Sequence, residues 1–85
     1  MFRKIFESKE IKALRAQVES MPDDPAAHFN LGAAYEKVGR VKDAVREFEE
    51  TLQHNPKSAE AHYNLALLYE KLNEGEKAIL NILKA

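Results

Sequence analysis

A chain of 85 residues is long enough for one domain but not for two, because each part would be too small to bury a core of its own. Hydrophobic residues make up 45% and charged residues 32% of the chain, a mixture that favours a folded helical protein over a disordered or membrane-spanning one. The net charge of -1 and the absence of cysteine argue against a nucleic-acid partner, disulfides and cysteine metal sites.

The first predicted helix covers residues 8–20. Its apolar residues Ile11, Leu14 and Val18 recur at helical spacing and form one stripe. The apolar residues of segment 2–6 fall on a different phase of the helical wheel. We interpret this segment as an extra turn that packs on the following helices. The alternative is a basic anchor on a membrane surface, which normally needs a longer basic face.

A second helix is predicted to begin at Asp24 and Pro25, which suit the N-cap and the first helical position. Its inner face is defined by residues at spacing i, i+3, i+4 and i+7, namely His28, Leu31, Gly32 and Tyr35. Gly39 is expected to end this helix, because glycine readily adopts the left-handed conformation that closes one. The stripe of a third helix comprises Val41, Ala44, Val45, Phe48 and Leu52. Pro56 stops it.

The chain then repeats itself at an offset of 34 residues, since residues 27–31 read AHFNL and residues 61–65 read AHYNL. Ser58 is expected to cap the first helix of the second repeat, as Asp24 caps that of the first. The final apolar stripe comprises Ala78, Ile79, Ile82 and Leu83. We therefore divide the single domain 1–85 into an N-terminal helix within 1–22, a first repeat at 25–58 and an incomplete second repeat at 59–85.

The repeat resembles the tetratricopeptide repeat family, a helix-turn-helix unit with small residues where its two helices cross. The residues that carry the resemblance are Leu31, Gly32, Tyr35, Gly39, Ala44, Phe48 and Pro56, then Leu65, Ala66, Tyr69, Ala78 and Ile82. His28 and His62 depart from the pattern, since the family often has tryptophan there. Residues 1–22 resemble a degenerate half-repeat, with Glu10 and Gln17 at positions that are small in the family. The resemblance implies an all-α fold, a right-handed α-α superhelix of two repeats preceded by an N-terminal helix.

Side-chain size gives an independent reason for this packing. Two helix axes approach closely where the side chains between them are small. The small residues on the inner faces are Gly32, Ala44, Ala66 and Ala78. Tyr35 and Tyr69 are expected to fill the space that remains beside these crossings.

No catalytic motif is recognisable, so we predict that the chain is not an enzyme. His28 and His62 recur because a repeat protein reuses its packing positions, and we interpret them as partly buried packing residues. A metal site that joined them would need further ligands, and none lies at helical spacing beside either. Neither a metal nor another cofactor is therefore expected. His54 suits the end of its helix, where a cation complements the helix dipole.

The charge-rich stretches 47–50 and 74–77 are interpreted as solvated outer faces of helices. Arg46 is expected to pair with Asp43 and Glu47, which flank it on the same helix. The alternative is that these charges form a docking patch.

Stacked repeats curve, so the first helices of the two repeats are expected to line a concave face that suits an extended segment or a helix. The predicted peptide- or protein-binding groove comprises Phe29, Asn30, Ala33, Lys37, Tyr63, Asn64, Leu67 and Lys71. In the family, an asparagine at the position of Asn30 and Asn64 often bonds to the backbone of a bound peptide. Clamps for a terminal carboxylate add lysine in the family, but Ala26 and Glu60 occupy one such position here. Lys37 and Lys71 of the predicted groove are compatible with an acidic ligand.

The last predicted helix has more apolar residues than a solvated end normally carries. The candidate self-association residues are Ile79, Leu80, Ile82 and Leu83. Either copies associate through them or the chain is an excerpt of a longer repeat array. If copies associate through these residues, the double variant Leu80→Glu and Leu83→Glu is expected to be a monomer in light scattering. A wild-type chain that is already monomeric at high concentration contradicts self-association.

These features predict a protein-interaction module in the cytoplasm that binds a peptide or protein segment and acts as an adaptor, co-chaperone or assembly scaffold. The alternative is a structural unit that forms homo-oligomers through its C-terminal helix. The two hypotheses are separable, because each predicts a loss of binding from a different surface. Nucleic acid is not expected as a partner, and neither is a membrane.

Overall fold

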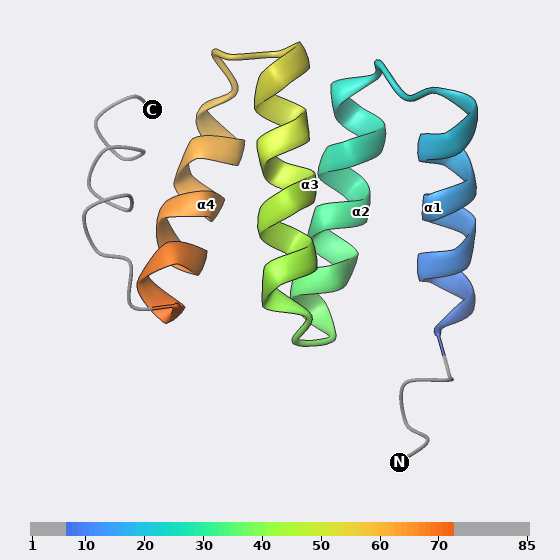
Figure 1. The fold of residues 1–85 in the computed structure, drawn as a ribbon, viewed down its shortest axis with the longest axis horizontal. Coiled ribbons are helices and arrows are strands. Elements are labelled where there is room, and N and C mark those ends of the chain that lie inside the picture. The colour runs from blue at the N-terminus through green and yellow to red at the C-terminus, as the bar shows by residue number, and fades with distance from the viewer. Residues whose placement is uncertain (1–6, 73–85) are drawn as a thin grey trace.

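The described part of the molecule is entirely helical. A computed structural model describes residues 7–72, which form α1 (Lys9–Ser20), α2 (Pro25–Lys37), α3 (Val41–His54) and α4 (Ala59–Lys71). Consecutive helices run antiparallel and are joined by short turns (Figure 1). The predicted all-α repeat fold is confirmed. The predicted stripe within 78–83 and the segment 2–6 lie outside the described residues.

Three of the four helices begin at a side-chain cap. The Ser8 hydroxyl accepts a hydrogen bond from the Ile11 backbone N–H at 3.0 Å, which caps α1. The Asp24 carboxylate caps α2 by accepting from the Ala26 N–H at 3.0 Å, with proline following at the first helical position. Ser58 caps α4 in the same way at 3.2 Å. The predicted starts are therefore confirmed, because each cap satisfies a backbone donor that the first helical turn leaves unpaired.

The end of α2 depends on Gly39, whose φ of 84° lies in the left-handed region that favours glycine. This conformation lets the Arg40 N–H donate to the Tyr35 carbonyl at 2.9 Å, while the Gly39 N–H donates to the Glu36 carbonyl at 3.0 Å. The two bonds form a Schellman motif, which satisfies carbonyls at the helix end and reverses the chain. The predicted role of Gly39 is confirmed, and α3 likewise ends at His54, just before Pro56.

The closest packing lies where α2 crosses α3. A Cβ atom added at Gly32 would lie 3.0 Å from Cε1 of Phe48, so a side chain at this position would require the Phe48 ring to shift. Phe48 and Ala44 on α3 are 0% exposed. Small residues therefore allow the two helices to approach, as predicted. Ala78, the corresponding residue of the second repeat, lies outside the described residues.

The helix before each repeat contacts the tyrosine of that repeat. Arg15 on α1 donates a hydrogen bond to the Tyr35 hydroxyl at 3.0 Å, and Ile11 is buried beside this contact in the core. One repeat later, the Tyr69 hydroxyl donates to the carboxylate of Glu49 on α3. The two pairs occupy equivalent positions, since both members shift by one repeat length. The 34-residue periodicity of the sequence thus extends to side-chain contacts.

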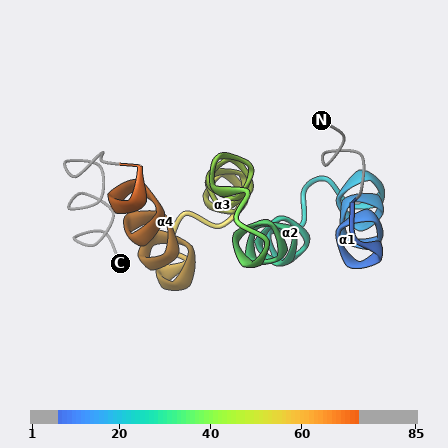
Figure 2. The ribbon, with the colours of Figure 1, turned by 90° about the horizontal axis from the view of Figure 1, so that it is seen from below.

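The helices do not lie in one plane. Viewed along their axes, α3 lies to one side of the line that joins α2 and α4 (Figure 2). As a result α2 and α4, the first helices of the two repeats, border a common face of the molecule. The residues of this face are those from which the sequence predicts a binding groove.

Candidate functional site

Aromatic side chains mark the face bordered by α2 and α4. Tyr63 on α4 is 55% exposed and Leu67, one turn later, is 38% exposed. Phe29 on α2 is half-buried, and its ring lies 5.2 Å from the ring of Phe48, centroid to centroid, at a tilt of 58°. Phe29 is therefore held in place by the core on one side, whereas Tyr63 projects into solvent.

Two hollows adjoin on this face. The larger has a volume of about 420 Å³ and is lined by Phe29, Ala59, Glu60, Tyr63 and Asn64. The smaller, of about 240 Å³, is lined by Pro25, Ala26, Phe29, Asn30, Thr51, Asn55, Ser58 and Glu60. Phe29 and Glu60 line both, so the hollows adjoin at these two side chains. Together they form an open depression between the beginnings of α2 and α4.

Polar groove residues accompany the hollows. Asn30 is exposed and Asn64 half-buried, and within residues 7–72 no hydrogen bond engages either side-chain amide. Lys37 lies at the other end of α2, where its Nζ is 3.6 Å from the Glu10 carboxylate of α1. Both members of that pair are largely exposed, so the pair stabilises the fold little.

The predicted groove residues thus separate into two groups. Phe29, Asn30, Tyr63 and Asn64 line the hollows. The other four, Ala33, Lys37, Leu67 and Lys71, are exposed on the same helices but line neither hollow. The predicted self-association residues 79, 80, 82 and 83 lie outside the described residues.

A second polar site lies on the other side of α2, around His28. This residue is only 6% exposed. Its Nε2 lies 2.7 Å from the Pro22 carbonyl oxygen and its Nδ1 lies 2.8 Å from Oε1 of Glu47. A carbonyl and a carboxylate can only accept, so the two bonds form together when both ring nitrogens carry a proton, which is the imidazolium form. Burial lowers the pKa of His28, but the bonds to Glu47 and Pro22 outweigh burial and raise it above its ordinary value of 6.5.

The Glu47 contact corrects one sequence prediction. Arg46 does not pair with Glu47, because Glu47 turns toward His28 and its side chain is only 14% exposed. Asp43 bonds to Arg46 at 2.6 Å, as predicted, and also to Arg40 at 2.8 Å. The charged run that begins at Glu47 is therefore not entirely a solvated face. Glu47, the first residue of this run, bonds to His28 on α2 instead.

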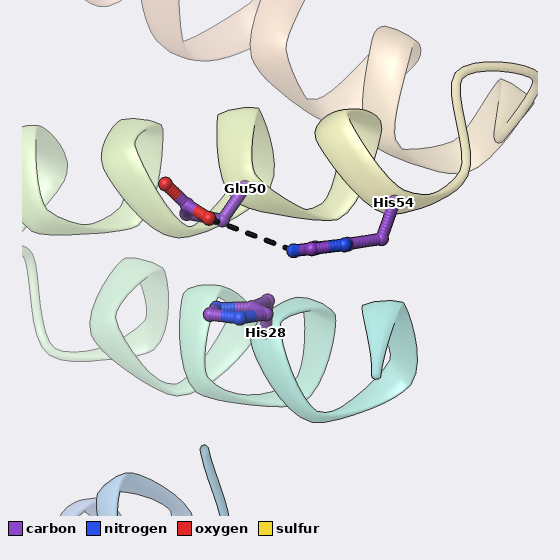
Figure 3. Close-up of side chains that lie close together, drawn as sticks. All are labelled: His28, Glu50 and His54. Carbon is purple, nitrogen blue, oxygen red and sulfur yellow. Dashed lines mark ion pairs between the residues drawn. The ribbon is translucent and has the colours of Figure 1, made fainter. Parts of the chain in front are cut away.

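His54 and Glu50 complete the surroundings of His28 (Figure 3). The two imidazole rings stack at 5.8 Å between centroids, with 13° between their planes. Oε1 of Glu50 lies 3.9 Å from Nε2 of His54, one turn further along α3. One ligand atom from each of the three side chains lies within 4.8 Å of the other two. We call these three residues the His28 cluster.

The sequence patterns do not predict this cluster. They compare His28 with His62, its repeat equivalent, whereas the structure brings it to His54. A usable signal exists, since Glu47, Glu50 and His54 recur at i, i+3 and i+7 and therefore share one face of α3. Both His28 and His62 are buried as predicted, and Nε2 of His62 lies 2.9 Å from the Pro56 carbonyl oxygen, which repeats the contact of His28 with Pro22.

The four antiparallel helices of residues 7–72, whose caps and tyrosine contacts recur one repeat later, define a helical-repeat protein of the helix-turn-helix class. Two sequence models of the tetratricopeptide repeat match residues 6–54 and 34–85, each more than half of the chain. The chain belongs to the tetratricopeptide repeat family. Membership confirms the resemblance seen in the sequence and supports a general role in protein interaction, with a protein as the partner.

Solved structures of MamA have the same fold. A crystal structure of MamA is 27% identical with a TM-score of 0.84, over 87% of this chain and 43% of that one. MamA of AMB-1 is 27% identical with a TM-score of 0.82, over 87% and 40%. MamA from Desulfovibrio magneticus RS-1 is 20% identical with a TM-score of 0.84, over 87% and 42%, and shows the fold alone. The chain spans less than half the length of these proteins.

The comparison with curated proteins gave no match. Among residues 7–72, no helix combines the length and the apolar character that crossing a membrane requires. The family and the MamA structures are therefore the comparisons on which a functional proposal rests.

Proposed function

We propose that the chain binds a peptide or protein segment along the face bordered by α2 and α4, and acts as an adaptor, co-chaperone or assembly scaffold in the cytoplasm. The observation that supports this most directly is the pair of hollows around Phe29. An aromatic side chain fixed by the core, an exposed aromatic side chain and unengaged amides lie together there. Such a combination suits a polypeptide, which offers both apolar side chains and backbone polar groups.

Each group has a distinct part in binding. Tyr63 and Phe29 supply rigid aromatic surface, which contributes much of the binding energy at protein interfaces. The amides of Asn30 and Asn64 each offer a donor and an acceptor, so they can pair with the N–H and C=O groups of an extended backbone. Because the described part of the chain leaves these amides unengaged, binding does not break an existing bond.

The charge of the residues that line the hollows determines which ligand charge is favoured there. Glu60 lines both hollows, at a position where family members that clamp a terminal carboxylate carry lysine. A carboxylate placed there would be repelled by Glu60. The lysines Lys37 and Lys71 lie in the last turns of their helices, away from the hollows. We therefore expect a neutral or basic segment at the hollows, with any acidic residues of the ligand placed toward the lysines.

The double variant Asn30→Ala and Asn64→Ala is expected to weaken binding by about tenfold or more, because each lost hydrogen bond contributes about 0.5–1.5 kcal/mol. A partner identified by cross-linking and mass spectrometry supplies the peptide, and fluorescence anisotropy gives the affinity. Gln53→Ala removes an exposed amide from α3 and is the matched control, with affinity unchanged. Equal affinity of the double variant and the wild type, with helicity intact in both, contradicts the proposed site.

A further inference from the structure

We propose that the His28 cluster, His28, Glu50 and His54, binds a divalent transition-metal ion such as Zn²⁺. The three side chains come from two helices and face one another across the α2–α3 packing (Figure 3). Their ligand atoms lie within 4.8 Å of one another. The site is separate from the groove, so it does not rest on the proposed function.

The donor set suits this class of ion. Two imidazole nitrogens and one carboxylate oxygen are ligands that zinc prefers, at about 2.0–2.2 Å. Two atoms that share an ion are then at most about 4.4 Å apart. Enclosing an ion therefore requires the three ligand atoms to move closer together and the two α3 side chains to change orientation. The side chains of Glu50 and His54 are 48% and 28% exposed and form a 3.9 Å pair with each other.

His28 is the fixed member of the site. Its Nε2–H donates to the Pro22 carbonyl at 2.7 Å. A metal-bound histidine usually makes this kind of contact with its second nitrogen, because the contact orients the ring and selects the tautomer. The other nitrogen, Nδ1, shares its proton with Glu47 at 2.8 Å. An ion that displaces this proton breaks the Nδ1–Glu47 bond, so the Glu47 carboxylate must turn aside, whereas the Pro22 contact stays intact.

The stacked rings define the movement that binding requires. An ion lies in the plane of each imidazole that binds it, but the planes of His28 and His54 are nearly parallel and 5.8 Å apart at their centroids. His54 must therefore rotate to direct a nitrogen at the ion. Since His54 is the exposed ring, it can turn without disturbing the core. Three protein ligands leave one position of a tetrahedral ion for water.

Isothermal titration of the full chain with zinc chloride at neutral pH tests the site. One ion per chain is expected, and thermal unfolding should shift to higher temperature when zinc is added. His54→Ala and Glu50→Gln alter exposed side chains, so both variants should fold normally. Each is expected to lower the zinc affinity about tenfold or more. Glu60→Gln, an exposed carboxylate in the groove, is the matched control and should bind zinc like the wild type.

Three results would overturn the proposal. The first is that the wild type gives no saturable one-ion binding. The second is that His54→Ala and Glu50→Gln bind zinc as tightly as the wild type, which places the ion elsewhere. The third is that zinc does not raise the temperature of thermal unfolding of the wild type. A tenfold loss in both variants, an unchanged control and a higher unfolding temperature of the wild type with zinc together support it.

Discussion

Phe48→Ala is expected to lower the free energy of unfolding by about 3–5 kcal/mol, which is the usual cost of removing a buried aromatic ring. Phe48 is 0% exposed, and its ring lies against both Gly32 and Phe29. Because Gly32 has no side chain, it cannot fill the space that the ring leaves. A loss of this size is a large part of the stability of a small domain. Urea unfolding followed by circular dichroism measures it.

Tyr63→Ala is the control for this change, because it removes an aromatic ring that is 55% exposed. Its cost should stay within about 0.5 kcal/mol, as is usual for a surface position. The difference between the two variants then reports the packing at the α2–α3 crossing. Similar costs for both, or a cost below about 1 kcal/mol for Phe48→Ala, would show that this crossing does not hold the fold together.

The helix boundaries could be predicted from sequence because they depend on neighbouring residues. Asp24 accepts a hydrogen bond from a backbone N–H two residues later, and Gly39 provides a backbone conformation that other residues adopt only with strain. Neither effect needs a distant part of the chain. The same holds for Ser8 and Ser58, whose hydroxyls cap the helices that they precede.

The α2–α3 crossing was also predictable, although it joins two helices. Helical spacing places Gly32 on the inner face of α2 and both Ala44 and Phe48 on the inner face of α3. A missing side chain opposite a large one leaves a single close arrangement, in which the ring occupies the space above the glycine. Residue size and period therefore determine this contact without any knowledge of rotamers.

The surroundings of His28 could not be predicted in this way. The sequence prediction pairs Glu47 with Arg46 on the same helix, but adjacent residues project in different directions from a helix and do not face each other. The structure shows that Glu47 instead bonds to His28 on another helix, where both side chains are largely buried. A buried charge-assisted bond outweighs an exposed pair, but burial is known only once the helices are packed. The stacking of His54 on His28 follows from the same packing.

The predicted groove could be located only in part from the sequence. The period of the two repeats places eight residues on α2 and α4, but it does not show where the face is hollow. The hollows lie between the beginnings of α2 and α4, because Phe29 is drawn toward Phe48 while Glu60 and Tyr63 stay at the surface. Lys37 is directed toward Glu10 of α1, which periodicity alone does not reveal.

His28→Ala is expected to lower the free energy of unfolding by about 2–4 kcal/mol at about pH 6. The substitution removes a buried ring and leaves the Pro22 carbonyl and the Glu47 carboxylate without their donor. Glu47 is 14% exposed, so water restores only part of its solvation. Chemical unfolding in buffer that contains a chelator measures the loss without a contribution from metal ions.

The cost of this variant should depend on pH with a definite sign. Because the folded protein raises the pKa of His28 above 6.5, the stabilisation is fully present below pH 6.5 and is lost as the pH rises through the folded value. The charged groups that act on His28 are Glu47 and Glu50, both on α3, and the His54 ring stacks on it. Wild type and His28→Ala should therefore differ most at about pH 6 and less at about pH 8.

Glu47→Gln separates charge from hydrogen bonding at the same position. The glutamine carbonyl can still accept from Nδ1 of His28, but it carries no charge to favour the imidazolium. The pKa of His28 should fall in this variant, so the loss of stability with rising pH begins at a lower pH than in the wild type. Glu50→Gln, which acts on His28 without a hydrogen bond, should shift the profile less. If Glu47→Gln and the wild type give the same pH profile, the Glu47 carboxylate does not hold the proton on His28, and another group must do so.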